Sequence, residues 1–358
     1  MTEQQEPSYA CDMQNRLDRI EKEIERVLPD HCSSEWIEQI VEQIMDNPTA
    51  QTYDEFCLPA KELLSSGGKR WRPLLMVLIA EILGSQEAAE KAYSLVTVVE
   101  LPHNGSLIID DIEDASEYRR GAPAAYITHG IDIAINAGNL LYYLPTSALD
   151  AADITDAKRL QIYQVYSKYL RRVHFGQGLD ITWHRHPEMI PSVEEYEQMC
   201  RFKTGCLAGM SAEIGAITAT DDQQIIRRAG ILAEKIGVGF QIKDDVINLR
   251  VGNPGKHRGD DIVENKKSLP IILFLKENPQ KLEYLLSIFK IAREKGIEKA
   301  HSEIEELIEL LLESGAVDRA EKRALALLEE SVAEIKELFD DSPARVELLS
   351  MLTRFRDS

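Results

Sequence analysis

The sequence predicts an all-α fold, for three reasons. Apolar residues recur every three or four positions through long segments, which is the period of one face of an α-helix. Runs that alternate apolar and polar residues between two-residue glycine turns, typical of β-hairpins, are not found in the sequence. Ser192 and Glu195 have the spacing of a capping box, in which both side chains bond backbone N–H groups at a helix start.

The first expected helix spans 12–28, where an apolar stripe is formed by Met13, Leu17, Ile20, Ile24 and Leu28. The same period predicts the remaining helices in order, over 53–64, 74–83, 88–114, 131–149, 156–183, 192–219, 222–249, 269–275, 304–312 and 320–338.

No linker divides the 358 residues, so we expect one domain over 1–358. We expect residues 1–45 to form an N-terminal helical extension that packs on the body or on a second subunit. Residues 279–358 are rich in Glu, Lys, Leu and Ala, which predicts outer C-terminal helices that close the bundle.

The charge balance limits the possible partners. The 41 Lys and Arg residues against 61 Asp and Glu residues give a formal net charge of -20, which repels nucleic acid and anionic membrane surfaces. We therefore expect no nucleic-acid partner. An anionic substrate must be held by a local cluster of Lys and Arg or by bound cations.

The cysteines and the hydropathy pattern indicate a cytoplasmic protein without a membrane span. The five cysteines are odd in number and lack the spacing of a disulfide framework or a metal site. The N-terminal residues lack the basic start and apolar run of a secretory signal. No uncharged stretch reaches the roughly 18 residues of a membrane span.

The first candidate site is the segment SLIIDDIEDASEYRR at the end of an apolar helix. Asp110 and Asp114 are four positions apart and share one helical face, and Asp111 flanks them. Such a set of oxygen ligands suits Mg²⁺, which keeps several waters and bridges to phosphate oxygens. Arg119 and Arg120 follow, and a guanidinium matches phosphate geometry. A solvated acidic helix end followed by Arg is the alternative for this segment taken alone.

A second carboxylate pair, Asp244 and Asp245, follows the apolar helix VGFQIKDDVINL. The surrounding residues leave no polar face for two charges except a cavity, and unpaired buried carboxylates are very costly without cations. We therefore expect the two acidic helices to face each other and hold several Mg²⁺ ions and one diphosphate.

Basic residues gather in glycine-flanked turns, which suits phosphate binding. The segment GGKRWRP places two glycines before a helix start, where backbone N–H groups favour an anion. An ordinary turn between helices is the alternative for this segment read alone. Further basic residues lie in GKHRGD, in ENKKS and in FKTG.

Taken together and in this order, these motifs resemble the trans-polyprenyl synthase family, and most closely its geranylgeranyl diphosphate synthases of the eukaryotic type. The resemblance runs from about residue 66 to residue 270 and rests on GGKRWRP, HNGSLIIDDIEDASEYRRGAP, GQGLDITW, FKTG, FQIKDD and DDIVENKKSLP. It implies an isoprenoid synthase bundle around a central cavity and a homodimer.

The resemblance also implies the roles of individual residues. Asp110, Asp114 and Asp244 would bind Mg²⁺, three ions per site, with Asp111 completing the first motif. Isopentenyl diphosphate would be bound by Gly68, Lys69, Arg72, His103 and Arg120. The allylic diphosphate would be bound by Arg119, Lys203, Lys256 and Lys266, and the developing cation would face Thr204 and Gln241. Supporting groups would be Gln177, Asp180 and Asp245.

Two positions depart from simple expectation. Pro102 stands beside His103 inside a predicted helix, where a proline removes a hydrogen bond and is expected to kink the helix. Asn248 stands where a third carboxylate of the second motif is commoner. A neutral amide can still hold a metal-bound water, so Asn248 does not predict loss of activity.

The implied reaction is ionisation, condensation and elimination. Isopentenyl diphosphate is joined to a dimethylallyl, geranyl or farnesyl diphosphate, with charge stabilisation and positioning supplied by the protein. Gly105 and Ser106 lie one helical turn before Asp110 and are small, which predicts an open tunnel and geranylgeranyl diphosphate as product. We expect Tyr142 and Tyr143 to form the tunnel floor.

Rival functions remain open from the sequence. A farnesyl or longer-chain synthase differs only in product length. A class I terpene cyclase also uses an Asp-rich helix, but it needs no isopentenyl site, so Lys69, Arg72 and Arg120 argue against it. A non-catalytic subunit of a heteromeric synthase should have lost site residues, whereas this chain keeps both Asp pairs.

Overall fold

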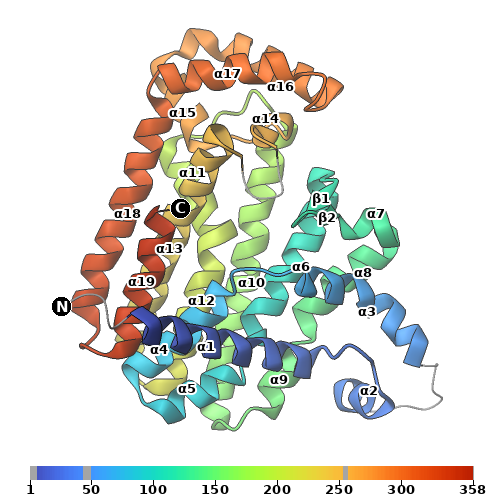
Figure 1. The fold of residues 1–358 in the computed structure, drawn as a ribbon, viewed down its shortest axis with the longest axis vertical. Coiled ribbons are helices and arrows are strands. Elements are labelled where there is room, and N and C mark those ends of the chain that lie inside the picture. Colours follow the sequence, from blue (N-terminus) through green and yellow to red (C-terminus); the bar gives the residue numbers. More distant parts are fainter. Residues whose placement is uncertain (1–5, 43–49, 253–256, 358) are drawn as a thin grey trace. The chain divides into compact units, whose positions relative to one another are not determined.

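The computed structural model describes residues 6–42, 50–252 and 257–357 and confirms the all-α prediction (Figure 1). Helices account for nearly every element. They are α1 Glu6–Val27, α2 Ser34–Val41, α3 Ala50–Ser65, α4 Trp71–Leu83, α5 Gln86–Tyr93, α6 Thr97–Asp114, α7 Ala125–His129, α8 Ile131–Tyr143, α9 Thr146–Ala151, α10 Asp156–Arg185, α11 Val193–Cys200, α12 Cys206–Ala219, α13 Gln223–Arg250, α14 Asp260–Val263, α15 Leu269–Glu277, α16 Leu282–Lys295, α17 His301–Glu313, α18 Ala316–Leu338 and α19 Pro343–Asp357. A π-helix, η1, spans Arg201–Gly205, and a 3₁₀ turn, η2, spans Pro279–Lys281.

The chain divides into two compact units. Unit 1 comprises Met1–Ser167, Met210–Gly230 and Phe339–Met351, and unit 2 comprises the remaining segments. Several boundaries fall inside helices, namely α10, α12, α13 and α19. One domain over 1–358 therefore stays a prediction, as do the limits of the terminal extensions.

In unit 1, helix α6 packs along helix α8, and glycines allow the close approach (Figure 1). A Cβ atom on Gly105 would lie 2.7 Å from the carbonyl oxygen of Gly138 and 2.9 Å from Cβ of Leu141. Such distances are shorter than real side chains allow, so Gly105 is a packing residue between two helices. The expectation that Gly105 lines an open tunnel stays a prediction, because its contact with α8 shows only that a larger side chain does not fit there.

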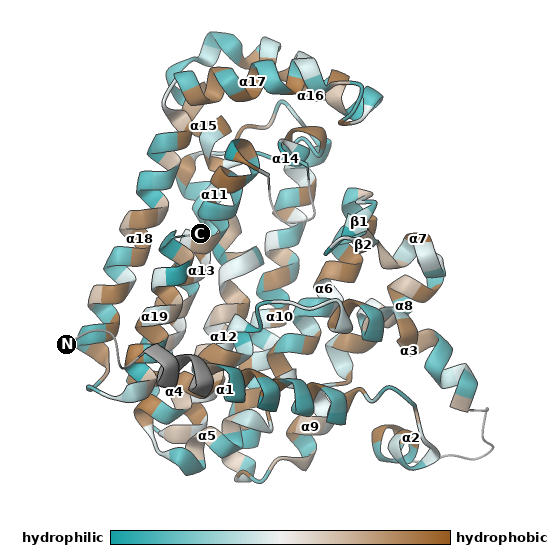
Figure 2. Ribbon diagram, viewed as in Figure 1, coloured by the Kyte–Doolittle hydropathy of each residue, from teal (hydrophilic) through white to brown (hydrophobic). Residues whose placement is uncertain are grey.

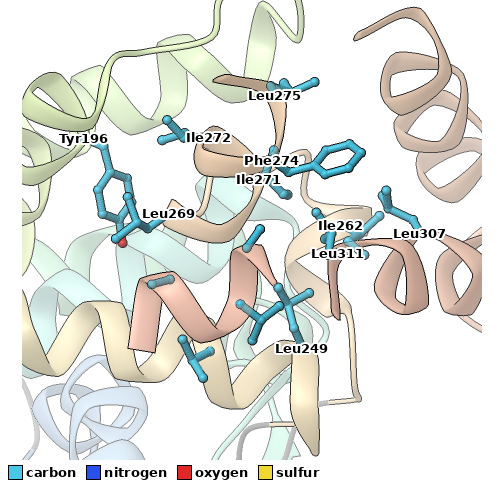
Figure 3. Close-up of a cluster of buried hydrophobic side chains, with 14 of the residues drawn as sticks. Tyr196, Leu249, Ile262, Leu269, Ile271, Ile272, Phe274, Leu275, Leu307 and Leu311 are labelled. Carbon is cyan, nitrogen blue, oxygen red and sulfur yellow. The ribbon is translucent and has the colours of Figure 1, made fainter. Parts of the chain in front are cut away.

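In unit 2, a cluster of buried apolar side chains joins the last turns of α13 to the helices that follow (Figure 3). Leu249 ends the α13 contribution, Leu269 and Phe274 come from α15, and Leu307 and Leu311 come from α17. Because Ile262 belongs to this buried cluster, the cluster fixes α14 and the residues that lead from it into α15, among them Lys266.

The C-terminal helices are amphipathic, as their composition predicts. Helix α18 buries Val317, Ala320, Ala324 and Leu328, which recur at helical spacing, and Figure 2 shows hydrophilic residues between them. Helices α16 and α19 escaped the sequence analysis, although their segments carry the same kind of pattern.

Three predicted helices are divided or interrupted in the structure. The segment 88–114 is divided, because the Ser94 hydroxyl donates to the carbonyl of Lys91 and tight turns follow before α6 begins. The segment 131–149 is divided into α8 and α9 near Pro145, which has no N–H to continue the ladder. The segment 192–219 is interrupted by the π-helix η1.

A short hairpin pairs β1 (Tyr118–Arg119) with β2 (Ala122–Pro123) in antiparallel register, which the sequence analysis missed. Its two turn residues, Arg120 and Gly121, have φ of 54° and 80°. A two-residue hairpin turn needs positive φ at both turn residues if it is to be compatible with the right-handed twist of the two strands. Each strand has only two residues, which is too few to show an alternating pattern in the sequence.

Close approach of helices also defines unit 2. A Cβ atom on Gly176 of α10 would lie 2.3 Å from the backbone nitrogen of Lys203 in η1. On the opposite side of η1, Gly205 and Gly237 bring its backbone against α13, with a Gly237 Cβ only 2.5 Å from the α-carbon of Gly205. The π-helix is therefore held between two helices by backbone contact.

We expect Gly176→Ala to lower the free energy of unfolding by about 1–3 kcal/mol, because the new methyl group overlaps backbone that cannot move independently. Gly178→Ala is the matched control, since Gly178 lies on the same helix with no atom within 4 Å of the added Cβ. Because alanine loses less backbone entropy than glycine when a helix forms, Gly178→Ala should leave the free energy of unfolding unchanged or raise it by up to about 1 kcal/mol. Urea titration of both variants measures their free energies of unfolding. Equal changes in the two variants would contradict the close packing of Gly176 against η1.

Candidate active site

Three aspartates of unit 1 gather at the C-terminal end of helix α6. The helix ends at Asp114, and Ala115 follows in the left-handed conformation with φ of 54°. Asp110 and Asp114 are half-buried and one turn apart, whereas Asp111 is buried. The predicted position of the acidic motif at a helix end is confirmed, and its carboxylates can converge on one side.

The hairpin returns Arg119 to these carboxylates. Its Nε donates to Asp111 Oδ1 at 2.9 Å, its Nη2 also bonds the same oxygen, and Nη2 lies 3.4 Å from Asp110 Oδ2. The contacts neutralise part of the acidic charge at the end of α6. Arg119, predicted for the allylic diphosphate, therefore lies directly beside the acidic motif.

The glycine-rich segment forms a left-handed loop before helix α4. Gly67 and Gly68 have φ of 95° and 145°, and Arg70 follows with φ of 45°. Gly68 and Lys69 are exposed, while Arg72 in the first turn of α4 is buried. The prediction of glycines before a helix start is confirmed. Such a loop can present backbone N–H groups and Lys69 to an anion.

Two of the predicted isopentenyl-site residues meet at the start of α4. Arg72 Nη1 lies 3.4 Å from His103 Nε2, and the Arg72 guanidinium also lies over the Trp71 ring at 4.5 Å. Helix α6 continues through Pro102, so His103 keeps helical register with Asp110 two turns later. The kink expected at Pro102 does not divide the helix.

The His103 imidazole is kept neutral by its surroundings. Burial lowers its pKa well below the ordinary value, and the nearby Arg72, Arg120 and Arg119 guanidinium groups lower it further. A neutral imidazole beside Arg72 can accept or donate one hydrogen bond at physiological pH. The contact with Arg72 favours the tautomer that accepts at Nε2.

Arg120 is the third cationic residue of the predicted isopentenyl site, and it bonds to the glycine loop and to α6. Its Nη1 donates to the carbonyl of Leu63 at 2.7 Å and to the carbonyl of Gly67, and its Nη2 donates to Asn104 Oδ1 at 3.2 Å. Gly68 lies within contact distance, since its Cβ would be 3.2 Å from Arg120 Nη2. Unit 1 thus brings Gly68, Arg72, His103 and Arg120 near the same loop.

In unit 2, the π-helix presents two consecutive residues to different helices. Lys203 Nζ donates to Asp180 Oδ2 of α10 at 2.6 Å, and Thr204 Oγ1 donates to Gln241 Oε1 of α13 at 2.7 Å. Gln241 Nε2 in turn donates to Asp245 Oδ1 at 3.1 Å. Two polar chains therefore start from neighbouring residues of η1, and all five of their members are predicted site residues.

Asp180 is held ionised by cations. Burial alone would raise the pKa of Asp180, but the Lys203 ammonium and His184, whose Nε2 lies 2.9 Å from Asp180 Oδ1, hold it well below its usual range. Gln177 lies three residues earlier on α10 and is half-buried. The buried anion fixes the direction of Lys203.

Asp245 is buried in the second acidic motif, and Asp244 beside it is half-buried. Asp245 Oδ2 accepts from the Tyr196 hydroxyl at 2.5 Å and from the Leu269 N–H at 3.2 Å. Burial, with a contribution from Asp261, raises the pKa of Asp245 to about 7. Asp245 is therefore tied into the core of unit 2, which leaves Asp244 as the ligand candidate of the pair.

The remaining predicted basic residues have different surroundings. Lys266 lies 3.4 Å from Asp261 Oδ1 and also pairs with Glu264, so it belongs to an acidic cluster of the segment before α15. Lys256 lies outside the described residues.

The candidate chain-length residues Ser106, Tyr142 and Tyr143 differ in how far they are buried. Ser106 is half-buried on the Asp110 face of α6, and its hydroxyl donates to the carbonyl of His103 at 2.7 Å. Tyr142 is buried, and its carbonyl accepts from the Tyr166 hydroxyl. Tyr143 is 72 % exposed in the single chain, so we retain only Tyr142 as the candidate floor.

Sequence reasoning missed Arg70, Glu100 and Asn104, which are buried next to the glycine loop. A usable signal was present, because Glu100 interrupts the apolar run TVVELP, and a lone carboxylate in such a run must be paired. It also missed Tyr196, whose partner is far away in the sequence, and His184, which lies one turn after Asp180.

The donor chemistry fits a divalent metal shared with a substrate. Asp110 and Asp114 supply only oxygen ligands, from side chains one helical turn apart. In the part of the chain that the structure describes, no three His, Cys, Asp or Glu side chains gather into a complete metal site. Mg²⁺ bound by one or two carboxylates and substrate phosphates needs no such complete protein site.

The fold and these half-sites define an all-helical enzyme that handles diphosphates through carboxylates and clustered cations. Comparison with known proteins agrees, since the chain matches the polyprenyl synthetase family over residues 54–310. The chain is 34% identical over 296 residues to a geranylgeranyl pyrophosphate synthase of Geoglobus acetivorans, covering 82% of this chain and 87% of the relative.

Other relatives differ in organism and in product. A geranylgeranyl pyrophosphate synthase of Penicillium paxilli is 34% identical, covering 70% of this chain and 65% of the relative. A geranylfarnesyl diphosphate synthase of Aeropyrum pernix is 32% identical, covering 76% and 84%. The crystal structure of geranylgeranyl pyrophosphate synthetase from Pyrococcus horikoshii matches with a TM-score of 0.83 and 28% identity, covering 99% of this chain and all of that chain.

The chain therefore belongs to the polyprenyl synthetase family and is a trans-prenyltransferase. The family uses prenyl diphosphate substrates and divalent metal ions. The archaeal and the fungal geranylgeranyl pyrophosphate synthase each have 34% sequence identity to this chain. Sequence identity therefore does not assign the chain to the eukaryotic or to the archaeal type. No described helix is long and apolar enough to cross a lipid bilayer.

The depressed pKa of His103 predicts a pH dependence of stability. Below about pH 6.5 the unfolded chain binds a proton on His103 that the folded chain does not bind, so stability falls as pH falls. The loss reaches at most about 1.4 kcal/mol per pH unit for one such group. Between pH 7 and pH 5.5, His103→Gln should lose less free energy of unfolding than the wild type. Parallel curves for the two proteins would contradict a neutral His103.

Proposed function

We propose that the chain condenses isopentenyl diphosphate with an allylic diphosphate and releases geranylgeranyl diphosphate as its main product. The observation that carries this proposal is the cationic loop of unit 1, where Gly68, Lys69, Arg72 and Arg120 lie near His103 and Asn104 of α6, before the aspartates that end this helix. A terpene cyclase takes a single diphosphate and needs no second cationic site. An enzyme that condenses two diphosphates needs a metal-binding carboxylate site for one of them and a cationic site for the other.

Each group then has a defined task. Asp110, Asp114 and Asp244 are the metal ligands of the proposal, and bound Mg²⁺ supplies charge stabilisation to the departing diphosphate. Lys69, Arg72 and Arg120 bind isopentenyl diphosphate and orient its double bond. Arg119, Lys203 and Lys266 contribute to the allylic diphosphate.

The polar pair in the π-helix suits the developing allylic cation. The Thr204 hydroxyl donates to Gln241, so the lone pairs of its oxygen remain directed away from that bond. These preorganised dipoles stabilise positive charge without rearrangement during the reaction. A proton leaves the condensed product to the released diphosphate, and the elimination completes one cycle.

The proposal for product length now rests on Ser106 and Tyr142. Ser106 lies one turn, about 5.4 Å, from Asp110 and is small, so the helix face beside the reacting diphosphate is not blocked at that level. Longer products, as in the geranylfarnesyl relative, and farnesyl diphosphate are the alternatives. Incubation with isopentenyl diphosphate, each allylic primer and Mg²⁺, followed by measurement of product chain length, tests the whole proposal.

A cytoplasmic homodimer completes the proposal. Support for a second copy comes from helix α8, which leaves Ile131, Ile135 and Tyr143 exposed at spacings of four and eight residues. Exposed apolar side chains in such a stripe favour an interface.

Removal of a proposed ligand should abolish turnover. Asp110→Ala and Asp244→Ala should each lower kcat by several powers of ten, because each removes a ligand for the metal that stabilises the leaving group. Glu113→Ala is the control, since Glu113 is exposed on the same turn as Asp114. Substantial Mg²⁺-dependent turnover by either folded aspartate variant would contradict the assignment.

Ser106→Phe should shorten the product towards farnesyl diphosphate, because the ring would fill the face of α6 one turn from Asp110. Ser106→Ala should leave product length unchanged. Gly105→Ala serves as a second comparison, since it disturbs the contact with α8 and should reduce stability without selecting a shorter product. Analysis of products by chain length decides, and an active Ser106→Phe enzyme with unchanged products would refute the role of Ser106.

A further inference from the structure

A buried carboxylate lies beneath the glycine loop of unit 1 without a role in the proposed reaction. Glu100 on helix α6 is 2 % exposed. Its Oε1 accepts from Arg70 Nη1 at 3.0 Å and from Asn104 Nδ2 at 3.0 Å. A carboxylate at this depth is costly unless its partners are well placed, so the two contacts must act together.

Arg70 extends from Glu100 to the loop. The residue is 4 % exposed, and its Nη2 donates to the carbonyl of Leu64 at 2.7 Å while its Nη1 lies 3.4 Å from the carbonyl of Gly67. Its other carboxylate partner, Glu21, is about half exposed and contributes less in contact with water. Glu100 is therefore the main buried counter-charge of Arg70.

Asn104 connects Glu100 to the second guanidinium. Its amide donates to Glu100, and its oxygen accepts from Arg120 Nη2 at 3.2 Å. Arg120 then donates to the carbonyls of Leu63 and Gly67. Two guanidinium groups thus reach the Gly67 carbonyl, and both are oriented from the same buried carboxylate.

The backbone of both arginines is held in an unfavourable conformation. Arg70 has φ of 45° and Arg120 has φ of 54°, values that residues with a Cβ rarely adopt. Such conformations persist where the surrounding contacts determine them. For Arg70 those contacts are the bonds of its side chain to the loop and to Glu100, and for Arg120 they are the hairpin turn and the bonds of its side chain to the loop and to Asn104.

We propose that Glu100 is a positioning residue for the diphosphate of the isopentenyl substrate. Acting through Arg70 and through Asn104 with Arg120, it fixes the Gly67–Lys69 loop so that Lys69, Arg72 and the N–H groups of Gly68 and Lys69 meet the anion without rearrangement. This inference rests on the function proposed above and adds a residue that touches no substrate.

The test compares Glu100→Gln with Glu347→Gln. Glu347 is 6 % exposed, lies in the same unit and pairs with Arg16 Nε at 2.9 Å, so both variants remove one buried charge from a Glu–Arg pair. Glu100→Gln should raise KM for isopentenyl diphosphate at least about ten-fold, with KM for the allylic primer changed less than about two-fold. Glu347→Gln should leave both constants unchanged, even where it lowers stability.

Direct binding gives a second readout. Calorimetric titration with isopentenyl diphosphate alone should show a similar rise in Kd for Glu100→Gln. If that variant does not fold, Asn104→Ala decides in its place, because it cuts the link to Arg120 and keeps the Glu100–Arg70 pair. It should raise the same KM several-fold.

Lys69→Ala separates this inference from the proposed function. A wild-type protein that does not condense the two substrates, or a Lys69→Ala variant with unchanged KM for isopentenyl diphosphate, overturns the proposed site and the role of Glu100 together. If Lys69→Ala raises that KM and the folded Glu100→Gln or Asn104→Ala variant does not, the role of Glu100 alone is overturned.

Discussion

A protein with a net charge of -20 that binds diphosphates must gather its cations in one place and offset the repulsion between them. Unit 1 meets this constraint with buried anions. Glu100 lies between Arg70 and Asn104, and Asp111 lies against Arg119, so that Arg70 and Arg119 are each oriented by a carboxylate before any substrate arrives. Gly68 and Lys69 are exposed beside these oriented cations.

Unit 2 also uses a buried anion to orient a cation. Lys203 is directed by the buried anion of Asp180, and Asp245 is fixed by the Tyr196 hydroxyl and the Leu269 N–H. The π-helix makes this possible, because it turns Lys203 and Thr204 towards different helices while glycines hold its backbone between them. A regular helix through these residues would change the direction of at least one of the two side chains.

The fold class and the acidic motifs could be predicted from the sequence because both are local patterns. Helical periodicity located α10, α13 and α15, and the capping box at Ser192 is present with both of its bonds. The hairpin at Arg120 and the network of Arg70, Glu100 and Asn104 could not be predicted in the same way. Both depend on positive φ values and on contacts between residues up to 57 positions apart, and neither feature produces a periodic pattern in the sequence.

Gly105 and Ser106 show how far adjacent small residues can differ in meaning. On a helix, neighbours point about 100° apart, so a residue that faces another helix stands beside one that faces the reacting end. Gly105 faces the Gly138 carbonyl of α8, whereas Ser106 lies on the face of Asp110. Small size at Gly105 is required by the contact between the two helices, so a substitution there changes helix packing as well as any space for the product. Ser106 is therefore the clearer of the two positions at which to test the effect of side-chain size on product length.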